Sequence, residues 1–168
     1  MKVQTTRFGA LDVQEDQVIT LTEGPLGFSE CTRFTMFTDE LGEPFQWLQS
    51  LEMPSLAFVV IEPSLILPEY QFSLQKDKIK NLEASGIDDL KVYVIVTMAA
   101  NILDITVNLQ GPIVINKENQ IGVQVVLNDP AFSTRHPLFT EHPENERGVK
   151  EAIENENKIA SLRVAAAG

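Results

Sequence analysis

The residues with the most evident capacity for chemistry are His136, His142 and Cys31. The two histidines are six residues apart in Arg-His-Pro and Glu-His-Pro contexts, and no third ligand follows at metal-binding spacing. Cys31 has no second cysteine to pair with and no nearby histidine, so we interpret it as structural. We therefore expect neither a metal site nor a reactive thiol.

Paired carboxylates occur at Asp39-Glu40 and Asp88-Asp89, where they could act as general acids or bases if burial or a neighbour shifted a pKa. Both pairs fall in predicted turns, so we interpret them as turn formers. Gly24-Pro25-Leu26-Gly27 has two glycines but lacks the lysine and the helix that a phosphate loop needs. There is no GxSxG motif and no dinucleotide fingerprint. These patterns predict a protein that is not an enzyme and has no cofactor.

Side-chain amides in strand-like segments are the more informative feature. The segment 45–50 alternates so that Phe45, Trp47 and Gln49 face one way while Gln46 and its alternate neighbours face the other. One interpretation is a packed Trp47 with Gln49 hydrogen-bonded at the rim of a barrel. The other is that Gln46 or Gln49 contacts a partner protein.

A second group of amides lies in the stretch 101–116. Asn108 and Asn116 each end a predicted strand, and each amide can bond turn backbone two residues further on. The Gly111-Pro112 turn between them also forms a corner rich in donors and acceptors, which could pair with another chain. Turn structure and partner contact both remain open at this point.

The elements that must position these residues are mostly strands. The most apolar one, 91–97, is apolar on both parities, which is typical of a strand buried on both faces at the centre of a sheet. One helix is predicted over 73–85, ended by Gly86, and we expect it to close one end of the barrel. The predicted strands are Lys2–Phe8, Gln17–Leu21, Arg33–Phe37, Phe45–Ser50, Leu56–Ile61, Leu90–Met98, Ile102–Asn108, Ile113–Asn116 and Gln120–Leu127. The predicted fold is mostly β, a small closed or nearly closed antiparallel barrel with one or two short helices and a C-terminal tail.

Composition limits the classes of partner. The chain has 168 residues and a formal net charge of −11, so its field repels nucleic acid and anionic lipid. The charge either keeps the protein soluble, which is its commoner role, or speeds encounter with a basic protein partner, and both interpretations stay open here. No apolar run is long enough to cross a bilayer and no secretory signal opens the chain, so we expect a cytoplasmic protein. We predict one barrel domain over 1–140 and an acidic tail over 141–168, either helical or mobile.

With these residues placed, the chain resembles the FliW family of flagellar assembly factors over about residues 1–135. No single motif carries the resemblance; the order and spacing of all of them do. The matching segments are Phe8-Gly9, Glu23-Gly24-Pro25-Leu26-Gly27-Phe28, Phe45–Ser50, Pro54–Pro63, Pro68-Glu69-Tyr70, Asn108–Asn116 and Gln124. Gly111 departs from the pattern, because many relatives carry a small residue such as alanine there, and we expect this only to loosen the turn.

The resemblance implies a β-barrel-like protein that binds flagellin in the cytoplasm. When free, it would bind CsrA, an RNA-binding translational repressor, and relieve repression of flagellin synthesis. Carried over residue by residue, the candidate protein contacts are Gln46, Gln49, Asn108, Gln110 and Asn116. Trp47, Phe58 and Tyr70 would pack in the core or rim. The alternative is a barrel that holds a small molecule or oligosaccharide in its mouth, and an aromatic-lined cavity of several hundred Å3 would favour it.

Overall fold

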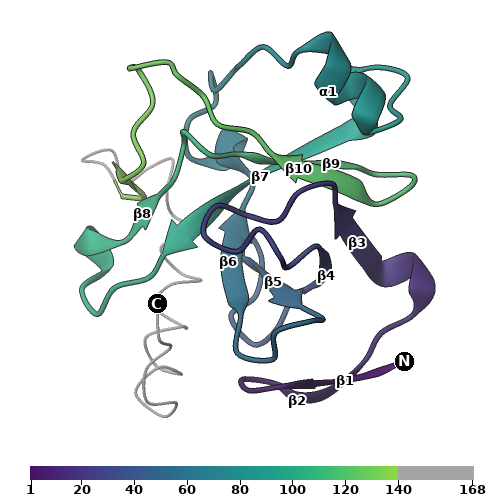
Figure 1. The fold of residues 1–168 in the computed structure, drawn as a ribbon. Helices are drawn as coiled ribbons and strands as arrows, with labels where there is room; N and C mark the ends of the chain where they lie inside the picture. The colour runs from purple at the N-terminus through teal and green to yellow at the C-terminus, as the bar shows by residue number, and fades with distance from the viewer. Residues whose placement is uncertain (140–168) are drawn as a thin grey trace.

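Seven strands close into a ring within residues 1–139, the part of the chain that the computed structural model describes (Figure 1). In order around the ring they are β7 (Leu90–Thr97), β6 (Ala57–Ile61), β5 (Gln46–Ser50), β4 (Arg33–Phe37), β3 (Val18–Leu21), β10 (Ile121–Gln124) and β9 (Ile113–Asn116), which pairs again with β7. The predicted closed barrel is confirmed. It is antiparallel throughout except between β3 and β10, which run parallel.

The predicted central strand, β7, holds the barrel together. One edge pairs with β6, where Val60 lies opposite Ile95. The other edge pairs first with β9, where Ile113 lies opposite Tyr93, and then with the short β8 (Thr106–Val107). A further short strand, β11 (His136–Pro137), extends the sheet beyond β8. Val94 is 0% exposed, because β7 has neighbouring strands on both edges and apolar side chains packed on both faces.

The barrel interior is filled by side chains. Alternate residues of a strand point to opposite faces, and one parity from nearly every barrel strand joins a single buried cluster. Its members are Ile19, Leu21, Cys31, Phe34, Leu48, Leu56, Val60, Tyr93, Ile113 and Ile115. On β10 this position is Gly122, where a Cβ would lie 3.0 Å from both Ile115 Cγ1 and Leu21 Cδ2. The interior is therefore a packed core.

The outer face of the barrel is also apolar, and the remaining segments cover it. A cluster around Trp47, Val59 and Val96 lies outside β5, β6 and β7, and Phe8 packs against it from the hairpin of β1 (Lys2–Thr5) and β2 (Gly9–Asp12). A smaller cluster joins Leu82 to the outward Val114 and Val123. This places α1 (Lys76–Asn81) against the outer face of β9 and β10. The expectation that the helix closes one end of the barrel is therefore wrong.

Several predicted boundaries also change. The strand predicted over 2–8 ends at Thr5, and the chain then reverses into β2, which begins at Gly9 with φ +68°. The helix predicted over 73–85 covers only Lys76–Asn81, with Leu82 as its C-cap. Glu83 then adopts φ +55°, and Gly86 is extended instead of ending the helix. The strand predicted over 102–108 begins with a 3-10 turn capped by Asn101. The 3-10 segments are η1 (Glu15–Gln17), η2 (Pro63–Leu65), η3 (Ile87–Asp89) and η4 (Ile102–Asp104).

None of the helices within residues 1–139 has the length and apolarity needed to cross a membrane. The tail predicted over 141–168, with His142, lies outside the described residues, so the predicted domain boundary stays a prediction.

Candidate protein-binding surface

The structure divides the five predicted contact residues into two groups. Gln49 and Asn116 are 0% and 3% exposed. Gln46, Asn108 and Gln110 are half-buried and keep part of their surface in solvent. A partner cannot reach the two buried amides in this fold, so their assignment as surface contacts is corrected to a structural one.

Gln49 is a clamp on the turn between β5 and β6. Its Nε2 donates to the carbonyl oxygens of Ser50 (2.9 Å), Leu56 (3.0 Å) and, more weakly, Pro54 (3.3 Å). The side chain lies on the same face of β5 as Phe45 and Trp47, as the alternation predicts, and this is the outer face of the barrel. The β1–β2 hairpin lies over it, since Thr6 N–H donates to the Pro54 carbonyl. The interpretation of Gln49 as a hydrogen-bonded rim residue is the one that the structure supports.

Asn116 performs the turn role predicted for it and a second role that the sequence did not indicate. Its Oδ1 accepts from Glu118 N–H at 2.9 Å, two residues further on. Its Nδ2 donates to the carbonyl oxygen of Leu82 at 2.9 Å, at the end of α1. One buried amide therefore joins the end of β9 to the helix that covers it.

Asn108 begins a loop, 108–112, that leaves the edge of β7 between β8 and β9. Asn108 N–H still donates to Ile95 O, and Asn108 Oδ1 accepts from Gln110 N–H at 3.0 Å, which is the predicted turn bond. The Tyr70 hydroxyl donates to Leu109 O at 2.6 Å. The loop backbone is thus hydrogen-bonded to β7 on one side and to Tyr70 on the other. It leaves part of the Asn108 and Gln110 side chains in solvent.

Gln124 connects this loop to the other Gly-Pro turn. Its Nε2 donates to Gly111 O at 3.0 Å, while its Oε1 accepts from Leu26 N–H at 2.8 Å. A Cβ on Gly111 would lie 2.8 Å from Gln124 Nε2 and 2.9 Å from Asn108 Nδ2. An alanine at Gly111 would therefore displace two amide groups, a larger effect than the loosened turn we expected. The sequence analysis included Gln124 only as part of the family pattern. The sequence feature that could have identified it is an amide at the end of a predicted strand, in a chain with two Gly-Pro turns.

The Gly24 turn, 23–27, owes its shape to its glycines. A Cβ on Gly24 would overlap the Phe28 carbonyl oxygen and lie 2.6 Å from the Cys31 carbonyl oxygen, and Gly27 has φ +86°. These contacts make the turn a close backbone packing element, which agrees with the absence of a phosphate-binding pattern in its sequence.

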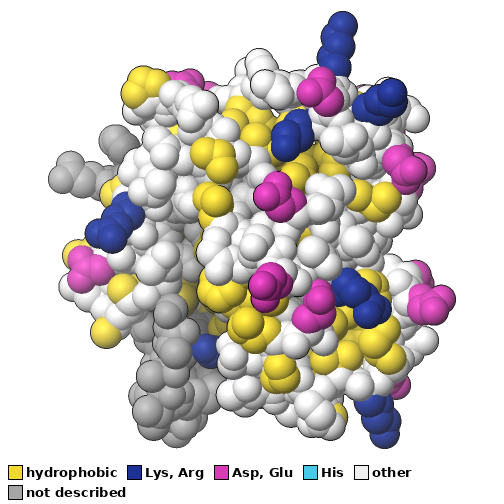
Figure 2. All heavy atoms as spheres, in the orientation of Figure 1, with side chains coloured by type: hydrophobic (Ala, Val, Ile, Leu, Met, Phe, Trp, Pro, Cys, Tyr) yellow, Lys and Arg dark blue, Asp and Glu magenta, His cyan; other side chains and the backbone are white. Residues whose placement is uncertain are grey.

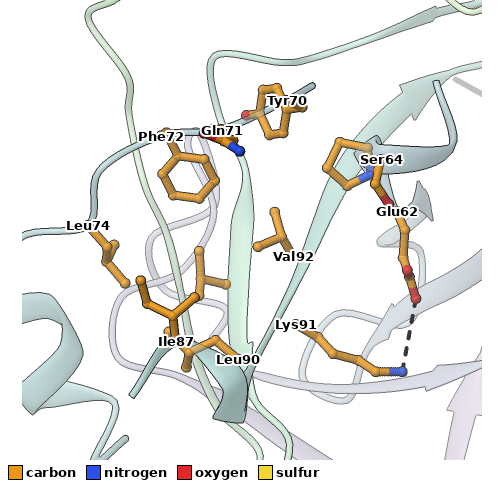
Figure 3. A pocket seen from close by; sticks show the side chains of 12 residues that line it. Glu62, Ser64, Tyr70, Gln71, Phe72, Leu74, Ile87, Leu90, Lys91 and Val92 are labelled. Carbon is orange, nitrogen blue, oxygen red and sulfur yellow. Dashed lines mark ion pairs between the residues drawn. The ribbon is translucent and has the colours of Figure 1, made fainter. Parts of the chain in front are cut away.

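A hollow of about 560 Å3, which we call the β7 cleft, lies on the outer face of the barrel (Figure 3). Figure 3 shows Phe72 and Leu74 on one side of it and Leu90 and Val92 of β7 on the other. Ile87 lies at its rim and is 74% exposed. At the far end Lys91 Nζ lies 4.0 Å from Glu62 Oε1. The β7 cleft is therefore largely apolar with one ion pair at its margin.

A second hollow of about 570 Å3, which we call the edge groove, lies between the Gly24 turn, α1 and the segment 124–128. Leu26 and Val126 line it and are 66% and 55% exposed. Figure 2 shows apolar side chains in several separate patches on this face of the molecule, with acidic and basic side chains spaced among them. A smaller hollow of about 350 Å3 opens at the barrel mouth, lined in part by Met36, Tyr93 and Lys117.

The residues with catalytic chemistry are dispersed. Asp39 Oδ1 accepts from Leu41 N–H and Asp89 Oδ2 from Ser85 N–H, each at 2.9 Å, so both act in turns as predicted. In the described part of the chain, no three His, Cys, Asp or Glu side chains come close enough to hold a metal ion.

Within residues 1–139, three groups have pKa values shifted from their ordinary ones, each for a structural reason. Burial raises the pKa of Tyr70 to about 12. Burial, with a smaller contribution from Glu62, also raises the pKa of Tyr93. Hydrogen bonds from backbone N–H groups, first that of Arg33, lower the pKa of Glu52.

The barrel interior is filled, and two hollows, the β7 cleft and the edge groove, lie on the outside. The protein is therefore a small β-barrel protein whose candidate binding surfaces are on its exterior. The chain belongs to the FliW family: the family model described as FliW protein matches residues 2–138. It is 44% identical to the flagellar assembly factor FliW of Geotalea uraniireducens (strain Rf4) over 89% of this chain and 91% of that protein. It is 39% identical to that of Treponema denticola, covering 84% and 95% of the two chains. A crystal structure of the flagellar assembly factor FliW superposes with a TM-score of 0.78 at 37% identity, covering 84% of this chain and 99% of the other.

Proposed function

We propose that this protein is a flagellar assembly factor that binds flagellin in the cytoplasm and, when free of flagellin, binds the translational repressor CsrA. By binding CsrA it relieves repression of flagellin synthesis. The observation that carries the proposal is membership of the FliW family over nearly the whole described chain, with a relative named flagellar assembly factor at 44% identity.

Charge supports the choice of a basic partner. The chain has 24 acidic and 13 basic side chains, for a net charge of −11. A field of that sign accelerates encounter with a cationic surface more than it increases final affinity. CsrA presents basic RNA-binding edges, so contact near those edges would displace RNA by occlusion or by altering the groove.

The candidate contacts are Gln46, Asn108 and Gln110, the three predicted amides that reach solvent. The sheet register aligns Gln46 with Val60 and Val60 with Ile95, whose carbonyl accepts from Asn108 N–H. Three inter-strand spacings separate Gln46 from Asn108, about 14 Å. A protein surface of ordinary interface size spans that distance, so one partner can reach both ends.

The regulatory cycle requires that one partner lower the affinity for the other. A coupling free energy of about 1–3 kcal/mol changes affinity by roughly one to two decades, enough to reverse occupancy as flagellin is exported. Both partners then compete for a single pool of this protein.

The test is a titration of the purified protein into a complex of CsrA with fluorescently labelled RNA, followed by anisotropy. Release of the RNA, and its rebinding when flagellin is added, is the expected result. RNA that stays bound at saturating protein would refute the CsrA step, and simultaneous binding of both proteins with full affinity would refute the cycle.

Substitution distinguishes the contact residues. Asn108→Ala or Gln110→Ala should weaken one partner, whereas Gln4→Ala, an exposed amide on the β1–β2 hairpin, should leave both affinities unchanged. Equal affinities for all three variants would remove the loop 108–112 from the binding surface.

A second candidate function is the binding of a small apolar molecule, which the β7 cleft favours. Its volume of about 560 Å3 and its Tyr70 and Phe72 side chains fall within the range of small-molecule sites. The barrel mouth, where we first expected such a ligand, has a smaller hollow of about 350 Å3, and the interior below it is filled. Native mass spectrometry of the protein purified from its own cells tests this, and a mass equal to the bare chain would argue against it.

A further inference from the structure

The β7 cleft is an opening in the apolar cluster around Leu82, on the outer face of the barrel (Figure 3). Ile87 lies at its rim with 74% of its surface exposed. The half-buried members of the cluster that line the cleft are Phe72, Leu74, Leu90 and Val92. Large apolar patches that reach solvent in this way usually mark a surface that another segment covers.

Charge does not select the occupant of the β7 cleft. Among the residues that the structure describes, the charged ones that line it are Glu62 and Lys91, and their Oε1 and Nζ atoms lie 4.0 Å apart. The two charges offset each other, so the cleft favours neither an acidic nor a basic segment. Its occupant is therefore selected by apolar side chains and by how closely it is held to the cleft.

The described part of the chain ends near this cleft. In β11, His136 lies opposite Val107 of β8, and Val107 lies opposite Val96 of β7. Phe139 packs against the same outer cluster as Tyr70, which lines the cleft. The segment that begins at residue 140 therefore starts beside a cluster that extends to the cleft.

The distance from this point to the cleft is short. Two strand spacings separate β11 from β7, about 10 Å, and the four steps along β7 from Val96 to Val92 add about 13 Å. Residues 140–148 span up to about 30 Å when extended. Residues from 149 onward can therefore reach the cleft.

The first large aliphatic residues after Phe139 have the spacing of a helix face. They are Val149 and Ile153, four positions apart, with Ala152 next to the second. On a helix, residues at this spacing lie one above the other and form a single apolar stripe. Such a stripe is the feature that docks a helix in an apolar groove.

We propose that the segment 148–154 of this chain folds back as a short helix into the β7 cleft, where Val149 and Ile153 pack against Ile87 and Val92. Because the segment is tethered, its effective concentration at the cleft is on the order of millimolar, which favours it over a free molecule. The protein's own chain then closes the cleft, and another molecule can enter only when the segment leaves. Flagellin and CsrA play no part in this docking.

The main test is paramagnetic relaxation in the full chain. A nitroxide attached to Lys150→Cys should broaden the methyl NMR signals of Ile87, because residue 150 lies beside the docked stripe. The native Cys31 is buried and should not take the label, which labelling of the wild-type protein checks. The methyl signal of Met53 is the control and should stay sharp, since Met53 precedes β6 and Glu62, at the cleft, follows it.

Two substitutions in the labelled protein identify the docking residues. Ile153→Asp should abolish the broadening of Ile87, because it would bury a charge among apolar side chains. Leu162→Asp introduces the same charge nine positions further on. Since a helix has about 3.6 residues per turn, that position faces the opposite side, and the broadening should remain.

Competition tests the same docking without a label. A segment that fills the cleft about nine-tenths of the time lowers the apparent affinity of a competing apolar dye about tenfold. Ile153→Asp should therefore increase the affinity for Nile red about tenfold, and Leu162→Asp should change it by less than about twofold. Thermal unfolding followed by circular dichroism checks that both variants keep the barrel.

Three results would overturn the proposal. They are equal broadening of Ile87 and Met53, broadening that survives Ile153→Asp, and an affinity for Nile red that Ile153→Asp leaves unchanged. Broadening that appears when spin-labelled molecules are mixed with separate isotope-labelled ones would show that the segment reaches a second copy, which also overturns docking within one chain. Each of these results leaves the binding of flagellin and CsrA to its own titration.

Discussion

Asn116→Ala should cost far more stability than Asn108→Ala, although the sequence presents the two residues as equivalent strand-ending amides. Asn116 is 3% exposed and makes two hydrogen bonds of 2.9 Å, one accepted from Glu118 N–H and one donated to Leu82 O. Asn108 is half-buried, and its side chain makes one bond, accepted from Gln110 N–H at 3.0 Å. The two substitutions therefore compare the loss of a hydrogen bond between distant segments with the loss of a hydrogen bond within one turn.

The expected magnitude follows from what each substitution leaves unpaired. Each intramolecular hydrogen bond contributes about 1 kcal/mol net, so Asn116→Ala should lower the free energy of unfolding by about 2 kcal/mol. The loss is not larger, because Leu82 O also accepts from Asn119 Nδ2 at 3.1 Å and the exposed Glu118 backbone can bond water. Asn108→Ala should cost less than about 1 kcal/mol, since solvent replaces its single bond.

Urea unfolding followed by circular dichroism measures both values, with the slope of the free energy against urea checked for each variant. A loss of about 2 kcal/mol corresponds to a melting temperature lower by roughly 4–8 °C for a chain of this size. Equal losses for the two variants, or a loss below about 0.5 kcal/mol for Asn116→Ala, would refute the assignment of Asn116 as the link between β9 and α1.

Three further expectations follow from the same contacts. Gly24→Ala should destabilise the protein by at least about 2 kcal/mol in urea unfolding, because its Cβ meets backbone oxygens that cannot rotate away; a neutral result would contradict this packing. Gln124→Ala should abolish the hydrogen-exchange protection of Leu26 N–H, whose acceptor is Gln124 Oε1, and protection that persists would point to another acceptor. The folded-state pKa of Tyr70 lies near 12, above the ordinary value of 10.0, so its contribution to stability is complete below pH 10 and is lost as the pH rises toward 12. Tyr70→Phe should reduce this alkaline loss in urea unfolding at a series of pH values, leaving the part due to Tyr93, and an unchanged profile would contradict the assignment.

The parts of the fold that the sequence predicts well are those with a strong local pattern. β4 and β9 match their predicted ranges, and β7 is central because a β-branched run that is apolar on both parities can only be buried on both faces. The alternation of Phe45, Trp47 and Gln49 is also correct. In each case the deciding information lies within a few neighbouring residues.

Local sequence patterns do not predict the apolar clusters on the outer face of the barrel. Gln49 faces out of the barrel, and an outward glutamine in a strand is normally a surface residue, so its burial depends on the β1–β2 hairpin some forty positions earlier in the chain. Asn116 is buried for a similar reason, since α1 lies over it. The helix itself is shorter than predicted, because its three lysines and one isoleucine stabilise only one turn and a half before Leu82 enters the outer core.

Gln124 shows why the two Gly-Pro turns are best understood as one unit. Its amide accepts from one turn and donates to the other. The backbone beyond it is hydrogen-bonded to the loop 108–112 through Val125 N–H and Leu127 N–H. The Gly24 turn and the loop 108–112 are therefore joined through one side-chain amide, and a substitution at Gln124 should loosen both of them together.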